Sequence, residues 1–469
     1  MISHFGILSL LPPILTVGLA VWKRQLLPSI FAGIWLGEVV LSHGKVLPAF
    51  VASFEACLKS LGDKVNLQII LFSLLAGSFL GLIKESNGVA GFINWFEKMK
   101  VFRGRRTAFP LTFLLNISVF VDSWSSMLVA GSIMKPIYTR LKISRERLAY
   151  FLHTTSLNFV AIVVLNSWGA YYMSLLRAQN YENPFALVVR SIPFNYYCLA
   201  SLILVMIVMA TDLTIGPMKK AERRAKEASG ESAEEKTKGG SGIQPSREKI
   251  TPRASNLVLP LVTLIVLVFV GLSISGGGDI IKGSGAAALF YAACVTILLS
   301  SILYLARGTF KFQEIIDIIF KGMGDLLPIA ALLVFALALG GVCRGLGTGV
   351  YLAELVKHNF PVFLLPAIIF AISCVISFAT GTSYGTFAIM IPIAMPMAMA
   401  AGVNPALMFG ACISGGVFGD NCSPISDTSI IASMVSETNV IDHVKTQIPY
   451  ALISASVALV IFLIVGALV

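Results

Sequence analysis

Apolar stretches of roughly 17 to 25 residues, the length of a helix that crosses the hydrocarbon core of a membrane, recur along the whole chain. The composition agrees with this pattern, because 56% of the residues are hydrophobic and only 13% are charged, whereas about a quarter of a soluble domain is charged. Backbone polar groups inside a membrane must be paired within the protein, which leaves helices or closed barrels. Segments of this length favour helices, and the sequence therefore predicts an all-α polytopic membrane protein.

The expected spans divide between two halves of the chain. In the first half they cover residues 5–22, 26–41, 67–84, 148–176 and 190–212. In the second half they cover residues 256–274, 284–306, 325–343, 405–435 and 447–469. Segment 107–134 lies between two basic loops and so must enter and leave the membrane by the same side. This segment and its counterpart, 361–401, are expected to be re-entrant hairpins.

The two halves look like copies of one another. When the first half is shifted onto the second, Gly81 coincides with Gly341. The same shift aligns three further pairs, Ser123 with Ser383, Ile133 with Ile393 and Pro136 with Pro396. The loop at 135–147 is basic, whereas its counterpart at 395–407 has no charged residue. Because basic loops stay on the cytoplasmic side, the copies are expected to cross the membrane in opposite directions, as inverted repeats do.

These patterns predict three regions. A first transmembrane repeat covers 1–213 and a second covers 255–469, each with about five membrane helices, a re-entrant hairpin and a broken helix. Between them, residues 214–254 form a charged linker in which basic residues outnumber glutamates and glycines interrupt the chain. The linker is expected to be cytoplasmic, solvated and largely disordered.

Four polar segments interrupt the apolar sequence. Two are the tips of the hairpins, at 120–126 and 380–386, and two are helix breaks, at 166–169 and 419–429. Unwound backbone inside a membrane is tolerated only where it is buried in protein or lines a wet cavity. We therefore expect the four segments to meet near the middle of the membrane and to form an ion or substrate site.

The candidate binding residues in these segments share a carboxylate, hydroxyl or amide oxygen. They are Asp122, Ser123, Ser125, Asn166, Ser167, Thr380, Thr382, Ser383, Thr386, Asp420, Asn421, Ser423, Ser426, Asp427 and Thr428. The three aspartates are candidate Na+ ligands, because a carboxylate among neutral oxygens suits a hard cation and can instead bind a proton. His153, early in the long helix that precedes the first break, is a candidate proton relay.

Each candidate also has a purely structural interpretation. Asp420 and Asp427 flank Pro424, and aspartate, serine and threonine around an early proline also cap helix N-termini. Hydroxyl groups in membrane helices also bond to their own backbone or join neighbouring helices. A single histidine is usually a packing residue, so His153 has this second interpretation as well.

Three motifs resemble the NhaC-type Na+/H+ antiporter family. The segment Phe418-Gly-Asp-Asn-Cys-Ser-Pro-Ile-Ser-Asp-Thr-Ser429 is similar to the family's Gly-Asp-His-Cys-Ser-Pro-Ile-Ser-Asp-Thr signature, and Gly381-Thr-Ser-Tyr-Gly-Thr386 is similar to its Gly-Thr-Ser-Trp-Gly-Thr. Val121-Asp-Ser-Trp124 together with Met134-Lys-Pro136 resembles its first hairpin. The chain departs from the family pattern at two positions, since His153 stands where an aspartate is common and Asn421 where a histidine is.

The resemblance implies a multi-pass carrier of the inner (cytoplasmic) membrane that exchanges cations for protons. It also implies an elevator-like inverted-repeat architecture, often dimeric, so a homodimer is a possible partner besides membrane lipid and a small inorganic cation or organic solute. No cofactor is expected apart from Na+ and H+ as coupling ions, and nucleic acid is not an expected partner. The leading hypothesis is a Na+/H+ antiporter.

Other functional classes fit the sequence less well. The alternative is an ion-coupled carrier of a small organic anion or amino acid, with Ser123, Ser383 and helix N-termini holding the carboxylate. A gated channel is disfavoured, because inverted repeats are typical of alternating access. The sequence contains no GxxxxGK[ST] phosphate-binding loop and shows no constellation of catalytic residues, so neither ATP-driven transport nor an enzyme is expected.

Overall fold

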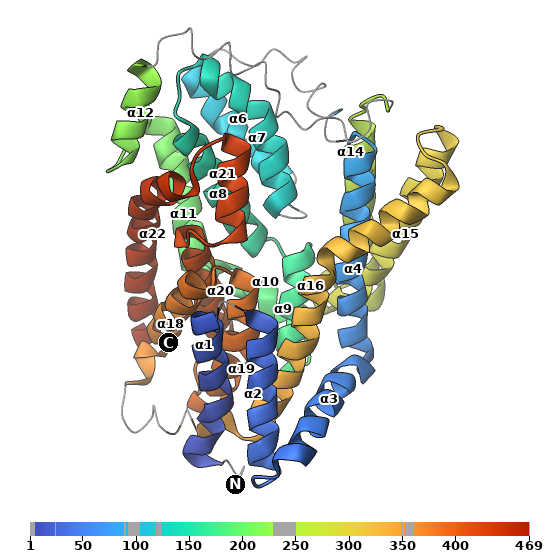
Figure 1. Cartoon of the computed structure of the whole chain (residues 1–469), viewed down its shortest axis with the longest axis vertical. Helices are drawn as coiled ribbons and strands as arrows, with labels where there is room; N and C mark the ends of the chain where they lie inside the picture. The colour runs from blue at the N-terminus through green and yellow to red at the C-terminus, as the bar shows by residue number, and fades with distance from the viewer. Residues whose placement is uncertain are drawn as a thin grey trace.

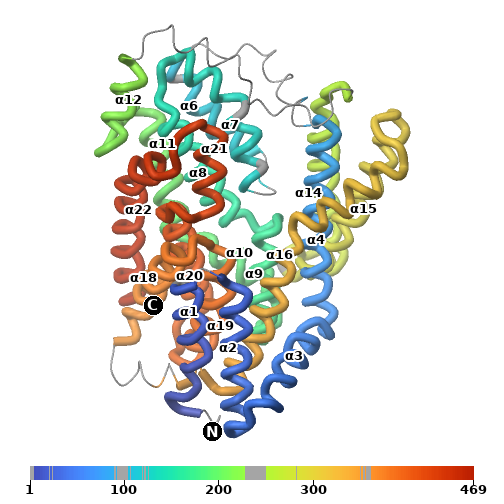
Figure 2. Tube along the Cα trace, in the orientation of Figure 1, coloured from blue at the N-terminus to red at the C-terminus, as the bar shows by residue number. Residues whose placement is uncertain are grey.

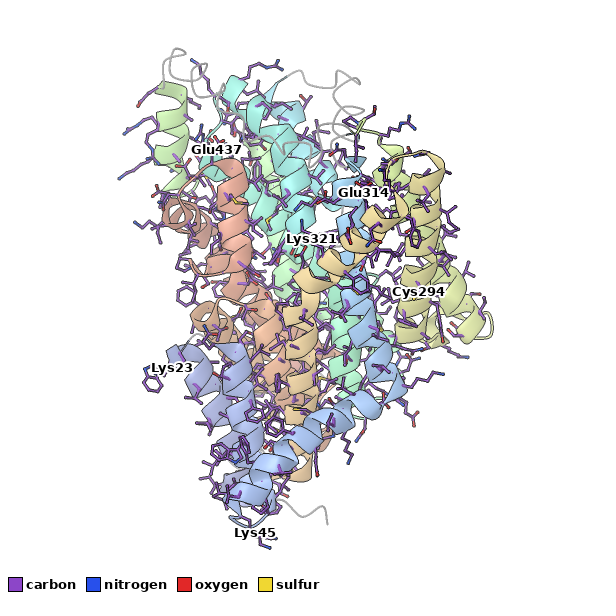
Figure 3. All side chains as sticks on the ribbon, turned by 45° about the vertical axis from the view of Figure 1, so that its right-hand side comes forward. Lys23, Lys45, Cys294, Glu314, Lys321 and Glu437 are labelled. Atoms are coloured by element: carbon purple, nitrogen blue, oxygen red, sulfur yellow. The ribbon has the colours of Figure 1, made fainter. Side chains whose placement is uncertain are left out.

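The computed structural model describes the chain over residues 5–23, 25–88, 91, 104–118, 120, 123–227, 250–348, 350–351, 354 and 361–468. All regular secondary structure within these ranges is helical. The helices run mostly along the long axis of the molecule (Figure 1). Lys45 lies at one end of the molecule and Glu437 toward the other (Figure 3). The prediction of an all-α fold is confirmed.

Seven of the described helices are long and apolar enough to cross a membrane, or up to nine if each bent pair counts as one span. The seven are α4 (Lys64–Glu85), α14 (Ser255–Ser275), α15 (Gly285–Ala306), α16 (Phe312–Gly345), η4 with α18 (Val362–Leu364 and Leu365–Thr380), α19 (Ser383–Ala401) and α22 (Val440–Leu468). The chain is therefore a multi-pass membrane protein.

Two of these helices cross in close contact. Helices α4 and α16 pack against each other, and α14 and α15 lie beside their upper parts in Figure 1. At the crossing, a Cβ on Gly77 would lie 2.0 Å from the carbonyl oxygen of Gly322. Only glycine lets the two backbones approach this closely, so these residues hold α4 and α16 in their crossing geometry.

The N-terminal part contains a helix that the sequence did not predict. The short helix η1 (Gly6–Leu10) leads into α1 (Leu11–Lys23) and α2 (Leu26–Leu41), which match the expected spans. No helix was predicted between the second and third spans, where the chain forms α3 (Val46–Gly62). Charged residues such as Glu55 and Lys59 interrupt its apolar sequence, so the segment lacks the long apolar run that predicts a membrane span.

Pairs of helices stand at both predicted hairpins and both predicted breaks, and the first break lies at 163–166 instead of 166–169. The first half contains the hairpin α6 (Arg105–Ser118) with α7 (Ser123–Arg140) and the pair α8 (Arg145–Ile162) with α9 (Ser167–Ala178), which is bent by 44°. The second half contains the hairpin α18 with α19 and the pair α20 (Pro405–Cys422) with α21 (Asp427–Ser436). The second break is shorter than expected, because residues 419–422 still belong to α20 and only 423–426 are non-helical.

The two hairpins lie toward opposite ends of the molecule in Figure 1, with α6 and α7 above and α18 and α19 below. Inverted repeats require this arrangement. The inverted repeat itself, its re-entrant hairpins and the three-region division of the chain remain predictions.

A second correction concerns the start of the linker; residues 228–249 of the linker lie outside the described residues. The first half ends with α10 (Pro184–Ser191), η2 (Ile192–Phe194) and α11 (Tyr196–Thr211). The following residues, predicted to be largely disordered, form the helix α12 (Met218–Glu227), which packs against α8 and lies beside α11 in Figure 2. Met218, Ala221 and Glu222 are buried, and these contacts order a segment whose composition alone predicts a solvated chain. A last short helix, η3 (Ile280–Lys282), joins α14 to α15.

Candidate functional site

The centre of the candidate site is the carboxylate of Asp420. This side chain is 2% exposed and lies near the end of α20, just before the break at 423–426. One carboxylate oxygen accepts hydrogen bonds from the Ser383 backbone N–H at 3.1 Å and from the Ser383 hydroxyl at 2.5 Å. The other accepts from the Thr428 hydroxyl at 2.5 Å and from the Ser426 hydroxyl. Four donors from α19, the break and α21 thus converge on a single carboxylate.

The tip of the second hairpin directs its donors at this carboxylate. Gly381 has a φ of 70°, a left-handed conformation that favours glycine, and it ends α18. Thr382 caps α19 by accepting the Gly385 N–H at 3.3 Å. Ser383 is the first residue of α19, so its N–H has no partner within the helix and lies at the positive end of the helix dipole. The tip therefore presents an anion-binding N–H and a hydroxyl to Asp420.

Close packing of α18 against α20 holds Asp420 at this tip. A Cβ on Gly419 would lie 2.4 Å from the backbone nitrogen of Phe378. The Ser377 hydroxyl donates to the Gly416 carbonyl at 2.5 Å. Because the contacts are to backbone atoms that cannot move aside, the position of Asp420 relative to α18 and α19 is tightly constrained.

The charge of Asp420 has no basic partner. Among the described residues, no lysine or arginine forms an ion pair with it. A buried charge without a counter-ion is costly, and hydroxyl and N–H dipoles compensate it only in part. Serine and threonine hydroxyls also carry lone pairs, so the same oxygens can turn toward a cation. The arrangement therefore suits either a bound cation or a bound proton.

A chain of hydrogen bonds leads away from Asp420 through His153. The Nε2 atom of His153 lies 2.9 Å from the Thr428 hydroxyl. Its Nδ1 atom lies 3.1 Å from Nε2 of His443 and 3.2 Å from the amide nitrogen of Gln447, both on α22. Both histidines are fully buried. His153 is thus joined to the carboxylate by one hydroxyl group.

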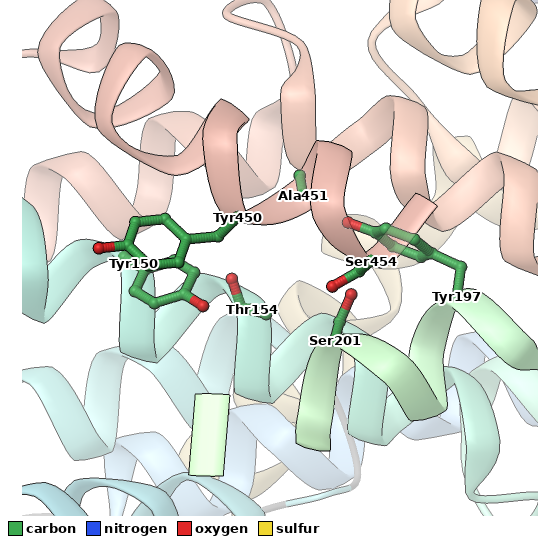
Figure 4. A pocket seen from close by; sticks show the side chains of 7 residues that line it. All are labelled: Tyr150, Thr154, Tyr197, Ser201, Tyr450, Ala451 and Ser454. Atoms are coloured by element: carbon green, nitrogen blue, oxygen red, sulfur yellow. The ribbon is translucent and has the colours of Figure 1, made fainter. Parts of the chain in front are cut away.

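A second branch runs to α11. The Gln447 amide donates to the Asn421 carbonyl at 2.7 Å, and the Asn421 side chain donates to the Tyr197 hydroxyl at 3.0 Å. Beside Tyr197 lies a narrow polar pocket between α8, α11 and α22, with no space for a water molecule. The residues that line it, shown in Figure 4, are Tyr150, Thr154, Tyr197, Ser201, Tyr450, Ala451 and Ser454. Buried polar side chains therefore continue past the histidines.

None of the remaining second-half candidates is one of the four donors to Asp420. The hydroxyls of Thr380 and Thr386 donate to carbonyls of their own hairpin, at 2.8 Å and 2.9 Å. The buried Ser423 hydroxyl has no hydrogen-bond partner in the part of the chain that the structure describes. Asp427 begins α21, is exposed, and accepts the Thr428 N–H at 2.8 Å, as a helix-capping carboxylate does.

The first-half candidates form hydrogen bonds with other groups. The Ser123 carbonyl accepts from the Ser156 hydroxyl at 2.8 Å. Asn166 caps α9 by accepting the Gly169 N–H at 2.9 Å, and the Ser167 hydroxyl lies 3.5 Å from the hydroxyl of Tyr384. Asp122 and the side chain of Ser125 lie outside the described residues.

Sequence reasoning missed three members of the network, namely Tyr197, His443 and Gln447. The last predicted span begins at residue 447, whereas α22 begins at Val440. The signal was present, because His443 and Gln447 are four residues apart and so share one face of a helix that continues into apolar sequence. Tyr197 has no comparable signal, since a single tyrosine in an apolar segment is also a common packing residue.

Comparisons with known proteins identify relatives. A sequence profile of the Na+/H+ antiporter family matches residues 166–467. An uncharacterized protein of Haemophilus influenzae is 31% identical over 485 residues, which cover 98% of this chain and 90% of that protein. The malate-2H+/Na+-lactate antiporter of Bacillus subtilis is 29% identical over 38% of this chain and 37% of its own length. The Na+/H+ antiporter NhaC of Alkalihalophilus pseudofirmus is 30% identical over 20% of this chain and 21% of its own length.

Two solved structures share the fold. The YdaH transporter of Alcanivorax borkumensis superimposes with a TM-score of 0.61 over 89% of each chain at 13% sequence identity. MtrF of Neisseria gonorrhoeae superimposes with a TM-score of 0.55, at 15% identity, over 89% of this chain and 84% of its own. At these identities the likeness is one of fold alone.

Proposed function

Because this chain belongs to the Na+/H+ antiporter family, we propose that it is a secondary active transporter, not an enzyme, that exchanges Na+ for protons across the cytoplasmic membrane. The observation that carries the proposal is the buried Asp420 carboxylate with its four converging donors and no described basic partner. Hard cations prefer carboxylate and other oxygen ligands. Ser383, Ser426 and Thr428 supply such oxygens around the carboxylate.

Competition for one carboxylate couples the two ions. With Na+ bound, the three hydroxyl groups turn their lone pairs toward the cation, and with H+ bound they surround a neutral carboxyl group. Both loaded forms are neutral at Asp420, whereas the empty form carries a buried negative charge. Moving that charge through a low-dielectric region is costly, so only the loaded forms cross. The carrier then exchanges one ion for the other instead of leaking either.

A second candidate is a carrier of small organic anions, which the malate-2H+/Na+-lactate antiporter among the relatives supports. The pocket beside Tyr197 has no space even for a water molecule, and so none for a small organic anion. The inorganic cation therefore fits the described interior better.

The experiment that tests the proposal uses purified protein in proteoliposomes with a trapped pH-sensitive dye. Addition of Na+ is expected to drive proton movement in the wild type, and Asp420→Asn, which preserves size but removes the charge, is expected to abolish it. The matched control is Asp317→Asn, because Asp317 is an exposed carboxylate on α16. Full Na+-driven flux in the Asp420 variant would refute the assignment. Silence of the wild type with Na+, Li+ and K+ would favour the organic cargo.

A further inference from the structure

Two histidines from different helices meet in the buried interior. His153 of α8 and His443 of α22 have ring centroids 5.3 Å apart, and a nitrogen of one ring lies 3.1 Å from a nitrogen of the other. Neither is exposed. Ionisable side chains inside a membrane protein are costly and usually mark ion or proton pathways, so this pair calls for a functional account.

The hydrogen-bond partners determine which way the protons point. An amide nitrogen only donates, and that of Gln447 faces the Asn421 carbonyl and Nδ1 of His153. Nδ1 of His153 is therefore an acceptor, and its ring proton resides on Nε2, which donates to the Thr428 hydroxyl. Thr428 in turn donates to Asp420. The Nε2 proton of His443 points at the same Nδ1 atom of His153 and shares its single lone pair with the Gln447 amide.

We propose that His443, His153 and Thr428 form a proton relay that ends on Asp420, with Nδ1 of His443 as the atom that accepts the incoming proton. The inference rests on the proposed function, because it names the route by which protons reach the proposed exchange site. Every donor in the chain points toward the carboxylate. Nδ1 of His443 is buried and has no hydrogen-bond partner in the described structure, so it is the open end of the relay.

The transfer balances at each atom. A proton binds Nδ1 of His443, whose Nε2 proton passes to Nδ1 of His153. The Nε2 proton of His153 passes to the Thr428 oxygen, and the former Thr428 proton passes to Asp420. All three relay groups end neutral, and the carboxylate becomes a carboxyl group. The side-chain oxygen of Gln447, which has no partner in the described structure, can then turn to accept the new N–H of His153.

The open end of the relay lies close to one face of the protein. His443 is within the first turn of α22, and the neighbouring residues Asn439, Ile441 and Asp442 are exposed. Glu437, which pairs with Lys135 and Arg145, lies at this end of the molecule in Figure 3. Protons therefore arrive from this face, which is also the face that carries α12.

No described lysine or arginine forms a hydrogen bond or ion pair with either imidazole ring. The titratable groups on the helices around the pair include Asp420 on α20, Asp427 on α21 and Tyr197 on α11, together with Tyr150 and Tyr450 on the helices of the pair. The charged residues on the other neighbouring helices are already paired, Arg105 and Arg147 with Glu222 and Lys135 with Glu437. Asp442 and Lys445, beside His443, are exposed. Proton binding by the pair is thus not opposed by a fixed positive charge in contact with it.

The test separates proton movement from cation movement in the same proteoliposomes. Na+-driven proton flux is measured with the trapped dye, and Na+/Na+ self-exchange, which needs no proton, is measured with 22Na+. Removal of a positioned proton-transfer group typically costs 10²–10⁴-fold, so His443→Gln is expected to slow proton-coupled exchange by at least roughly tenfold. Its self-exchange is expected to stay near the wild-type rate. His153→Gln, which breaks the next link, is expected to behave in the same way.

The matched control is His43→Asn, since His43 is an exposed histidine with a φ of 55°, a conformation that asparagine tolerates. It is expected to keep both fluxes. Wild-type proton flux in His443→Gln and His153→Gln would overturn the relay while leaving the proposed function intact. Loss of both fluxes in both variants would assign the pair a structural role and would also overturn the relay. Absence of both fluxes in the wild type would instead count against Na+/H+ exchange itself.

Discussion

Substitution of Glu222 by glutamine tests whether buried charge pairing holds α12 against the membrane helices. Glu222 is 4% exposed. One of its carboxylate oxygens accepts from the Ser144 N–H at 3.0 Å and the Ser144 hydroxyl at 2.8 Å. The other pairs with Arg105 and, at 3.4 Å, with Arg147. Burial by itself raises the pKa of Glu222, but the hydrogen bonds from Ser144 and Arg105 and the charge of Arg147 outweigh it and hold the pKa below its usual value.

The expected cost follows from what glutamine retains. Its amide oxygen still accepts from Ser144, but its NH2 group faces the two guanidinium groups and removes their shared counter-charge. Breaking a buried ion pair by removing one partner costs about 3–5 kcal/mol. Asp212 remains paired with both arginines, and this remaining anion places the expected loss at the lower end, about 3 kcal/mol.

Hydrogen exchange of the peptide that covers α12 measures this loss directly, because amides exchange through local opening. A loss of about 3 kcal/mol raises the exchange rate by roughly 100-fold. The matched control on the same helix is Glu227→Gln. Its partner Arg223 lies 3.6 Å away, and the side chains of Glu227 and Arg223 are 66% and 74% exposed. Exposed pairs contribute about 0.2–1 kcal/mol at most, so this variant is expected to change exchange only a few-fold. Equal exchange in the Glu222 variant and the wild type would refute the reasoning.

Two further predictions concern pH and packing. The pKa of Glu222 is lower in the folded protein than in an unfolded chain, where it is about 4.3. Its contribution to stability is therefore complete above the unfolded-state pKa and is lost as the pH falls through the folded-state pKa. In the wild type, hydrogen exchange of α12, corrected for the intrinsic rate, is therefore expected to speed up below about pH 4. Glu222→Gln is expected to show no such increase, and parallel pH profiles for the two proteins would contradict the assignment. Gly419→Ala is expected to lower both the melting temperature and Na+-driven flux, because its Cβ would lie 2.4 Å from the Phe378 nitrogen. Gly324→Ala, with nothing within 4 Å, is the control, and equal melting temperatures for the two variants would show that the α18–α20 contact is not constraining.

Much of the fold was predictable because its causes are local. The length of an apolar run decides whether a segment can cross a membrane, and proline, glycine and polar clusters decide where a helix stops. The helix boundaries at α2 and α14 and the break before α9 follow from these signals. The part of the site around Asp420, Ser426 and Thr428 was predictable for the same reason, since these residues lie within nine positions of one another in a single polar segment.

The failures have a common cause in packing. Helices α3 and α12 carry enough charge to resemble loops or linkers, and α12 is ordered by contacts with Arg105, Ser144 and Arg147 that only the folded chain provides. A sequence pattern records the polarity of each residue but not which surface covers it. For this reason, the sequence pattern predicts a solvated chain for charged segments that pack against the membrane helices.

The sequence by itself determined that this chain is a helical membrane protein, that polar segments interrupt its helices, and that Asp420 stands in one of them. Only the tertiary structure decided what surrounds that carboxylate. Ser383 reaches it from 37 positions away, and His153 and His443 meet across 290 positions. The physical reason is that hydrophobic length and helix termination act over a few residues, whereas hydrogen-bond partners between helices depend on how those helices cross. The proton relay we propose can therefore be identified from the fold but not from the sequence.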